Sequence, residues 1–481
     1  MDNAFILLEI VFIPIVGSLL LPLFGLISSR LRNFLALLFV LCSFALSLAL
    51  IPPVLSGETL TFSKQLALGF NFVLVADGLA VFMACVSSFI SAIIVLYSFD
   101  YISHYENRNE YYFMMVLFLG SMMGLVLSGN LIFLYFFWEM TALTSWRLIG
   151  FFREKTHVLK ANKAFLVTIF GALAMLVGFI IIYNQTGSFD LAVIKESFKT
   201  IPVANLAVLL ILAGIFSKSA TLPFHTWLPD AGVAPSPVTA MLHAAILVKI
   251  GTYVFARLFL ATFALVTDWH TIILVITAAS ALIAAGAAMI EKDIKRIVAY
   301  STISQIGFIF FGLAVGNQTA VAGGLLYIMM HGLAKAGLFL GAGVIEQNTG
   351  IRDITKLGGL IRTMPVTAAA FLGCSLSVMG IPPFGGFFSK YLLFSGAISS
   401  GRIAIALVFL VGAFMTIIYL FRLFNMVFMG EPQTSRAKEK SPMMVACVML
   451  LAVLSLAGGI FINYPSHFVQ VAVQGMVGLI N

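Results

Sequence analysis

The sequence predicts an all-α polytopic membrane protein with about fourteen transmembrane helices. Three observations predict it: an apolar composition, a scarcity of charge, and a series of long apolar segments joined by short loops. Of the 481 residues, 61% are hydrophobic and only 10% are charged, whereas a soluble protein carries about a quarter charged residues. A soluble core could not bury this much apolar surface, so lipid must surround the chain.

Each expected span contains the roughly 20 apolar residues that a membrane-crossing helix needs. We expect the first span to be retained, because the residues before it lack the basic region of a signal peptide. The sequence shows no inserted soluble domain and no low-complexity linker. The spans are expected to begin near Phe5, Asn33, Val75, Tyr111, Leu131, Lys163, Asn205, Ser236, Thr271, Ile297, Val321, Val366, Ile403 and Met443.

Basic residues are distributed unequally between alternate loops. The even-numbered loops hold only Lys64, Lys195, Lys199 and Arg402. Cytoplasmic loops are enriched in Lys and Arg, so we expect the odd-numbered loops to be cytoplasmic and both termini to face outward. Orientation signals also explain the net charge of +8 without nucleic acid. The odd-numbered loops hold Arg30, Arg32, Arg108, Arg153, Lys155, Lys160, Lys163, Lys292, Lys295, Arg296, Arg352, Lys356, Arg362, Arg436, Lys438 and Lys440.

The cysteines predict no metal or redox site. Cys42, Cys85, Cys374 and Cys447 each stand alone in an apolar stretch, without metal-ligand or redox spacing. The chain also lacks haem and iron–sulfur motifs and a nucleotide-binding glycine fingerprint. We therefore expect no cofactor, and any redox chemistry would have to take place in another chain.

Seven further Lys and Arg residues lie within or at the edge of apolar segments. A cation at bilayer depth costs at least about 2.5 kcal/mol, and such residues are usually functional. Arg257 and Arg422 lie toward segment ends, where a long side chain can reach the interface. The other five are Arg147, Lys218, Lys249, Lys335 and Lys390.

The fifth and seventh spans carry a candidate ion pair. Glu139 is preceded by an apolar run, so its carboxylate needs a nearby cation to ionise, and Lys218 is the expected partner. Pro223 and Pro229 follow Lys218 and cannot continue a regular helix. A broken helix at membrane depth lines a polar cavity or is buried in protein, so we expect an ion path here. An ordinary interfacial loop is the alternative.

The eighth and eleventh spans carry histidine with lysine. His243 and Lys249 are six residues apart and therefore on different helix faces, where they could serve successive neighbours along a path. Buried, hydrogen-bonded core is the alternative for His243. His331 and Lys335 are four apart and share a face. Two like charges there would repel, so at least one should be neutral, which suits the passing of a proton.

The twelfth span repeats the combination of lysine and helix break. Pro382 and Pro383, flanked by glycines, interrupt it before Lys390. In the seventh span the lysine stands on the other side of the break. This echo indicates two five-helix repeats of opposite orientation, which are typical of transporters. We expect a three-helix segment over 1–110, five-helix repeats over 111–262 and 263–429, and a last span over 430–481.

Taken together, the motifs resemble the antiporter-like subunits of respiratory complex I, membrane-bound hydrogenases and Mrp-type cation/proton antiporters. The resemblance extends from about Val75 to Arg422. It implies fourteen helices, two inverted five-helix repeats, broken helices in spans seven and twelve, and a central axis of protonatable residues. The motifs are Trp138-Glu139, Lys218 through Asp230, Asp293 through Gly307, His331 through Lys335 and Ile381 through Lys390.

The resemblance also implies roles for individual residues. Glu139 would pair with Lys218, Lys249 would bridge the two halves, and His243 would lie on the adjacent broken helix. The axis would continue through His331 and Lys335 and end at Lys390.

Some positions depart from the family pattern. Arg147 stands where an uncharged residue is expected and could compete with Lys218 for Glu139. Ile169 and Ala172 replace an Arg and an Asp of the longest complex I subunit, and no long lateral helix is expected after the last span. Lys390 replaces the glutamate of another complex I subunit. A hydrogenase-type, Mrp-type or divergent complex-I-like member therefore fits better.

The leading expectation is a proton-translocating subunit of a complex-I-like NADH/quinone oxidoreductase or a membrane-bound hydrogenase. It would have no active site of its own and would lie in the cell membrane of a prokaryote. Its partners would be other membrane subunits, including further antiporter-like ones, and a peripheral redox module. The alternative is a subunit of a Mrp-type Na⁺/H⁺ antiporter without a redox partner, with sodium as an additional cargo. A stand-alone carrier or an enzyme is disfavoured, because the sequence offers neither a substrate cluster nor a catalytic set.

Overall fold

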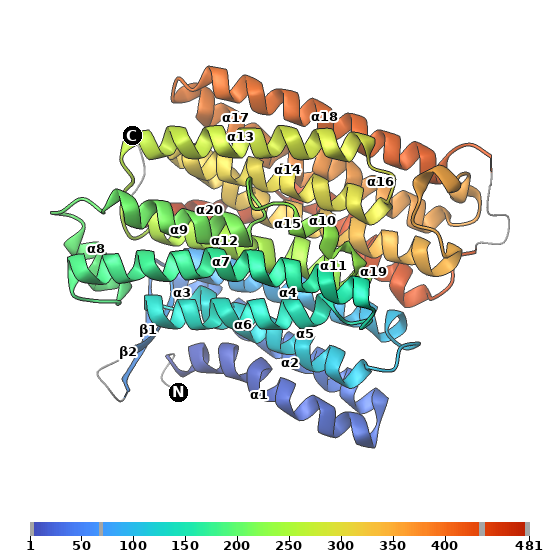
Figure 1. Cartoon of the computed structure of the whole chain (residues 1–481), viewed down its shortest axis with the longest axis horizontal. Helices are drawn as coiled ribbons and strands as arrows, with labels where there is room; N and C mark the ends of the chain where they lie inside the picture. Colours follow the sequence, from blue (N-terminus) through green and yellow to red (C-terminus); the bar gives the residue numbers. More distant parts are fainter. Residues whose placement is uncertain (1–3, 67–70, 432–437, 477–481) are drawn as a thin grey trace.

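The protein is a bundle of long helices lying side by side (Figure 1). The computed structural model describes residues 4–66, 71–431 and 438–476. Within these residues, eleven helices are long and apolar enough to cross a membrane. The predicted all-α membrane fold is confirmed, with one exception near the N-terminus. Arg436, counted above among the loop residues, lies outside the described residues.

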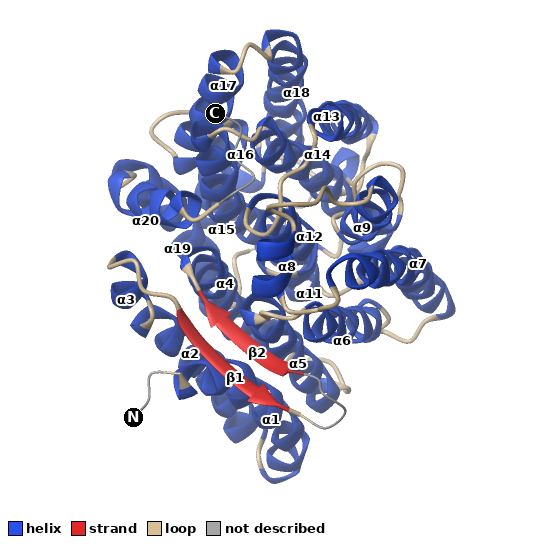
Figure 2. Cartoon of the chain, turned by 90° about the vertical axis from the view of Figure 1, so that its left-hand side faces the viewer, coloured by secondary structure: helices blue, strands red, loops and turns tan. Residues whose placement is uncertain are grey.

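The exception is a β-hairpin that the sequence did not predict. Val75, the expected start of the third span, lies in strand β2, and the helix begins only at Gly78 because the Asp77 carboxylate caps it by accepting a hydrogen bond from the Ala80 N–H at 2.9 Å. Figure 2 shows the hairpin at one end of the bundle. The elements of this region are α1 (Phe5–Ile27), α2 (Ser29–Ala49), α3 (Ile51–Leu55), β1 (Leu60–Gln65), β2 (Asn71–Ala76) and α4 (Gly78–Tyr101).

Spans four to eight follow, and the eighth is irregular. Two π-helical segments, Met241–Ala245 and Ala256–Leu260, flank its central α-helix. The α-helices are α5 (Arg108–Leu127), α6 (Leu131–Ile149), α7 (Lys155–Thr186), α8 (Leu191–Ser197), α9 (Asn205–Lys218), α10 (Trp227–Asp230), α11 (Ser236–Ala240) and α12 (Leu247–Phe255).

Helices α13 to α20 complete the bundle. Short 3-10 turns at Ile354–Lys356 and Leu360–Arg362 connect two of them. The α-helices are α13 (Thr267–Ile290), α14 (Ile294–Val315), α15 (Gln318–Thr349), α16 (Pro365–Met379), α17 (Gly385–Ser399), α18 (Ile403–Phe428), α19 (Pro442–Ile460) and α20 (Asn463–Gln474).

The two five-helix repeats share local details. Helices α7 and α15 each have 32 residues and each ends at a glycine with positive φ, Gly187 at 70° and Gly350 at 71°. After each glycine the chain forms an isolated antiparallel bridge to the residue that caps an earlier helix, Asn130 with Asp190 and Asp293 with Asp353. The limits 111–262 and 263–429 stay a prediction.

The two repeats are inverted. The first bridge lies near α8, at the hairpin end of the bundle, and the second lies near α16, at the opposite end (Figure 1). We call that opposite end the basic face, because the connections there carry Arg30, Arg108, Arg153, Lys292 and Arg352.

Spans seven and twelve are broken, as predicted. Helix α9 ends at Lys218 and α10 begins at Trp227, with Pro223 between them. Helix α16 ends at Met379 and α17 begins at Gly385, with Pro382 and Pro383 between them. Pro229 lies inside α10, so it does not contribute to the break.

Burial separates central helices from peripheral ones. The most apolar stretches of α14 and α15 are 94% buried, whereas those of α1 and α18 are only 33% buried. Polar residues on α14 and α15 therefore face protein and not lipid.

Candidate functional site

Four lysines are buried at the centre of the bundle. Lys218, Lys249, Lys335 and Lys390 expose 5% or less of their surface. Each ammonium nitrogen donates a hydrogen bond to a main-chain carbonyl oxygen of another helix. The acceptors, in the same order, are Trp138 O at 3.1 Å, Ile328 O at 3.2 Å, Val298 O at 3.1 Å and Val378 O at 2.8 Å.

The predicted contact between Glu139 and Lys218 is not formed. Among the described residues, the ion pairs within 4.0 Å include none of the four buried lysines. Lys218 Nζ instead binds the carbonyl of Trp138, the residue before Glu139, and lies 5.2 Å from the centre of the Trp138 ring. Glu139 Oε1 is buried and lacks a hydrogen-bond partner within the described chain. The carboxylate and the ammonium are therefore neighbours without direct contact.

The structure joins the eighth and eleventh spans through Lys249 and His331. Lys249 Nζ lies 2.7 Å from His331 Nδ1. The sequence did not predict this contact. His243 lies on the π-helical segment, and its ring centroid is 4.4 Å from that of Phe339. Both His243 ring nitrogens are buried and unpartnered within the described residues, so they are free to accept or donate a proton.

A glycine allows the helix of Lys249 to approach the end of α9. A Cβ atom on Gly251 would lie 2.6 Å from the carbonyl oxygen of Ile215, closer than real Cβ contacts. Gly251 thus brings α12 against the last turn of α9, where Lys218 lies. The first two lysines of the series are therefore on helices in direct backbone contact.

A cluster of hydroxyl and amide groups adjoins Lys390 and was missed by sequence reasoning. The Lys390 ammonium lies 5.6 Å from the ring centre of Tyr327. The Tyr327 hydroxyl donates to Gln305 Oε1 at 2.6 Å, and Gln305 Nε2 donates to Thr416 Oγ1 at 3.1 Å. Ser301, bonded to a tyrosine hydroxyl at 2.7 Å, is four residues before Gln305. A spacing of four residues places Ser301 and Gln305 on one face of a helix, and this spacing is the sequence signal that could have predicted the cluster.

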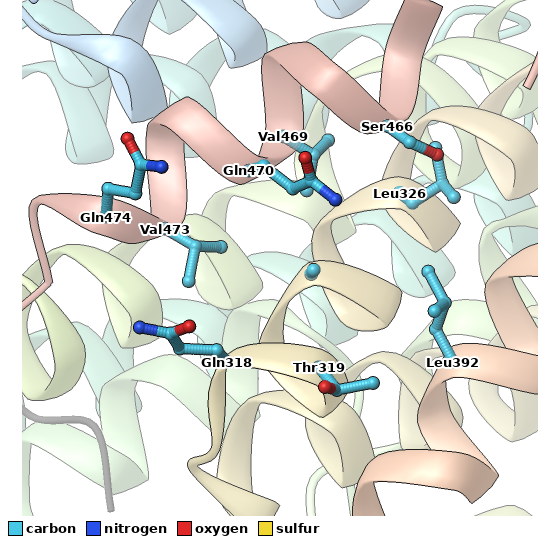
Figure 3. A pocket seen from close by; sticks show the side chains of 10 residues that line it. Gln318, Thr319, Leu326, Leu392, Ser466, Val469, Gln470, Val473 and Gln474 are labelled. Atoms are coloured by element: carbon cyan, nitrogen blue, oxygen red, sulfur yellow. The ribbon is translucent and has the colours of Figure 1, made fainter. Parts of the chain in front are cut away.

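Two cavities adjoin α17. One of about 490 Å³ adjoins Lys390 between α17 and α18, and it is otherwise lined mainly by apolar side chains such as Phe394 and Leu410. The other, of about 250 Å³, lies between the start of α15, α17 and α20 (Figure 3). Gln318, Gln470 and Gln474 line it without a charged side chain, so it lacks the titratable groups of the axis.

The intramembrane arginines lie away from the lysines. Arg147 pairs with Glu110 on α5, so the expectation that it competes for Glu139 was wrong. Arg257, in the last turn of the eighth span, is 7% exposed and pairs at 2.5 Å with Asp77, the residue that caps α4. Arg422 Nη1 donates to the Glu291 carbonyl at 3.0 Å.

The sequence matches two family descriptions. Residues 64–112 match "NADH-Ubiquinone oxidoreductase (complex I), chain 5 N-terminus", and residues 128–416 match "NADH:quinone oxidoreductase/Mrp antiporter, TM". The chain belongs to the NADH:quinone oxidoreductase/Mrp antiporter transmembrane family. The predicted resemblance is confirmed.

Curated members of this family resemble the chain closely. It is 34% identical over 485 residues to the Na(+)/H(+) antiporter A1 subunit of Staphylococcus haemolyticus, covering 94% of this chain and 60% of that protein. It is 35% identical over 446 residues to the corresponding Na(+)/H(+) antiporter subunit of Alkalihalophilus pseudofirmus, covering 85% and 55%. The chain thus spans somewhat over half the length of these relatives. Both relatives come from bacteria, which, with the many membrane-spanning helices of this chain, supports a plasma-membrane location.

Solved structures confirm the fold. A chain of the Mrp complex from Dietzia sp. DQ12-45-1b superposes with a TM-score of 0.89 at 23% identity, covering 98% of this chain and 97% of that one. A chain of the archaeal membrane-bound sulfane sulfur reductase gives 0.88 at the same identity and coverage. Both solved structures are only 23% identical and therefore show the fold alone. Of the two functions left open by the sequence, the two curated sequence relatives, both named Na(+)/H(+) antiporter subunits, favour the antiporter.

Proposed function

We propose that this chain is the antiporter-like subunit of a Mrp-type Na⁺/H⁺ antiporter and carries protons along a buried axis. The observation that carries the proposal is the series of four buried lysines held by main-chain carbonyls, in a chain whose relatives are named antiporter subunits. The axis consists of Glu139, Lys218, Lys249, His331, His243, Lys335 and Lys390.

Carbonyl oxygens suit lysines that must give up a proton. A buried ammonium without a counter-ion is costly, and loss of its proton removes that cost. A neutral amine can still sit beside the carbonyl and accept a proton again. A permanent carboxylate partner would instead hold the proton in place.

The contact between Lys249 and His331 supports direct proton transfer. At 2.7 Å, the Lys249 ammonium can donate to His331 Nδ1 when that ring nitrogen is unprotonated. When that proton moves, the lysine becomes neutral and the imidazole becomes charged. Release from Nε2 then passes the proton on and leaves the other tautomer of the neutral ring. One such step advances the proton from the eighth span to the eleventh.

Glu139 supplies the switch at the other end of the axis. Movement of Lys218 Nζ from the Trp138 carbonyl to the adjacent carboxylate would stabilise the ammonium and load a proton. The return movement would favour its release. Sodium would act on this switch by competing for the carboxylate, since the lysines offer no oxygen ligands for a rigid cation site.

The assembly and orientation belong to the same proposal. The chain works with other membrane subunits, including further antiporter-like ones. The basic face lies in the cytoplasm, because basic loops are retained there, and both termini lie outside. The segments 1–110, 111–262, 263–429 and 430–481 serve as the N-terminal helices, the two repeats and the last span.

Two measurements test the proposal. The genes adjacent to this one would be expressed together with it in an antiporter-deficient host, and sodium would be added to everted vesicles that hold a proton gradient. Sodium should collapse part of the gradient without NADH or another electron donor. Purification of the complex should yield further membrane subunits and no flavin or iron–sulfur protein. Co-purification of a redox module, with proton movement only during electron transfer, would refute the antiporter in favour of the oxidoreductase.

A further inference from the structure

One face of α15 connects the axis to the basic face of the molecule. His331, Lys335, Phe339, Gly343 and Glu346 follow one another at intervals of four, four, four and three residues, so they form one stripe along the helix. Glu346 lies eleven residues beyond Lys335, which is about 16 Å along the axis. Its side chain is 25% exposed, so it is the member of the stripe within reach of water.

Glu346 is held by groups from three other segments of the chain. Its Oε2 lies 2.7 Å from Nζ of Lys295, which exposes only 1% of its surface. Arg352 Nε lies 4.0 Å from Oε1. The Ser236 hydroxyl donates to Oε2 at 3.4 Å and accepts a hydrogen bond from the Tyr101 hydroxyl at 3.4 Å. The carboxylate therefore faces two cations on one side and a chain of hydroxyls on the other.

The hydroxyl side leads toward His243. Ser236 begins α11, and His243 lies seven residues later, in the π-helical segment that continues α11. A Cβ atom on Gly343 would lie 2.6 Å from Ser236 Cβ, so the glycine permits α11 and α15 to pack closely. Phe339 contacts the His243 ring at a centroid distance of 4.4 Å. The two helices thus run together from Glu346 to a histidine whose nitrogens are unpartnered in the described structure.

We propose that Glu346 is the proton port of the axis at the basic face, and that Ser236 passes protons between it and His243. This inference rests on the proposed function and adds the group through which that axis meets water. In the inward step, hydronium gives a proton to Glu346 Oε2, and the carboxylic acid then gives it through the Ser236 hydroxyl and water to a His243 ring nitrogen. The port ends as a carboxylate and the histidine as an imidazolium, so charge and protons balance.

Lys295 positions the port. Its Nζ also donates to the carbonyl of Ala234 at 3.2 Å, in the connection that leads from α10 to α11. It therefore holds Glu346 beside the start of α11. A purely structural role for the Glu346–Lys295 pair is the competing explanation, and it predicts equal damage from the loss of either partner.

Glu291 provides a matched control. It pairs at 2.8 Å with Arg296, which lies on α14 like Lys295, and its side chain is 23% exposed. Partial burial raises the pKa of Glu291, but hydrogen bonds from Arg296 and two backbone N–H groups outweigh this and hold it below its usual value. Glu291 thus resembles Glu346 in burial and pairing but lies outside the α15 stripe.

The experiment compares Glu346→Gln with Glu291→Gln in the whole co-expressed complex. Sodium-driven proton movement in vesicles is normalised to assembled protein. Glu346→Gln should lower the rate by about 100-fold or more, the low end for a lost proton-transfer group, and Glu291→Gln should stay within about twofold of the wild type. Glu346→Asp should recover part of the rate. In a second variant, Glu346→Ala, formate should restore part of the transport, because the small acid can carry protons in the space that the missing side chain leaves.

Lys295→Met separates the port from a structural pair. The port predicts that Lys295→Met retains more transport than Glu346→Gln and that formate does not improve it. Equal loss in both variants, without formate rescue of Glu346→Ala, would overturn the port. So would a wild-type rate in assembled Glu346→Gln. Lys218→Arg in the same vesicles distinguishes failure of the port from failure of the axis. If Lys218→Arg is inactive, the proposed axis stands whether or not Glu346 proves to be the port. Wild-type transport by Lys218→Arg would refute the axis itself.

Discussion

Replacement of Lys218 by arginine tests whether this side chain must release its proton. Both side chains carry a positive charge and can donate to the Trp138 carbonyl, which accepts from Lys218 at 3.1 Å. Both can also lie against the Trp138 ring, 5.2 Å from the present ammonium. Lys218→Arg therefore preserves the charge and the donor and removes mainly the ability to become neutral.

The size of the expected effect follows from the proton affinity of arginine. A guanidinium has a pKa above about 12. At pH 7.5, fewer than about one side chain in 10⁴ is neutral, and each unit of pKa corresponds to about 1.4 kcal/mol. Forming the neutral guanidine at this pH would thus cost about 6 kcal/mol. Transport by Lys218→Arg should fall below detection, which is a decrease of at least about 100-fold.

The assay is sodium-driven proton movement in everted vesicles that contain the whole complex. Assembly is measured in the same membranes by native electrophoresis, because the larger guanidinium must fit a site that is fully buried. Lys218→Ala serves as the second variant, since it fits the site without strain and also cannot carry a proton. Wild-type rates in assembled Lys218→Arg would show that Lys218 is only a fixed charge and that the proton axis is wrong.

Three other substitutions have defined outcomes. Glu139→Gln should impair transport and Glu139→Asp should retain part of it, measured in the same vesicles; equal rates for both would contradict the switch. Lys390→Ala should lower transport strongly while the complex still assembles, and normal transport would remove Lys390 from the axis. Arg257→Met should destabilise the purified complex by about 3 kcal/mol, the low end for a broken buried pair because Asp77 is partly exposed. Burial raises the pKa of Asp77, but the charge and hydrogen bonds of Arg257 outweigh burial and hold this pKa below its usual value. The ion pair therefore stabilises the fold fully above the unfolded pKa of about 4. This stabilisation is lost as the pH falls through the pKa of Asp77 in the folded protein. The unfolding temperatures of wild type and Arg257→Met should therefore differ equally between pH 6 and 9. The difference should begin to shrink near pH 4 and vanish below the folded pKa of Asp77; a constant difference at all pH values would contradict the ion pair.

The sequence predicted the helices well because lipid imposes a strong length and composition rule. Helices that begin at Phe5, Asn205, Ser236 and Ile403 start at the predicted residue. The hairpin escaped this rule because the apolar residues of β2 continue directly into α4, and a hydropathy pattern has no signal that separates a buried strand from a helix. Asp77, a good helix cap, was the available clue to the boundary.

The site was predicted in its residue types but not in its contacts. All four lysines of the axis are buried as expected. The contact of Lys249 with His331, however, joins residues 82 positions apart, and no spacing rule relates them. Arg147 was misassigned for the same reason, since its partner Glu110 lies on a different helix. Spacing predicts which residues share a face, but only packing decides which faces meet.

The two broken spans show how inverted repeats can differ in sequence and still place charge similarly. Lys218 ends α9 before its break, whereas Lys390 follows the break in α17. Lys390 nevertheless reaches back across the break, and its Nζ donates to the carbonyls of Val378 and Met379 at 2.8 and 3.4 Å, in the last turn of α16. An ammonium is favoured there by the unpaired carbonyls of a helix C-terminus. Both breaks thus have a buried lysine beside them, although α9 and α16 enter the membrane from opposite faces (Figure 1). The two amines bind different carbonyls, Lys218 that of Trp138 on α6 and Lys390 those at the end of α16. The two repeats therefore share one feature, a buried lysine at the break, and either side of the break can supply it.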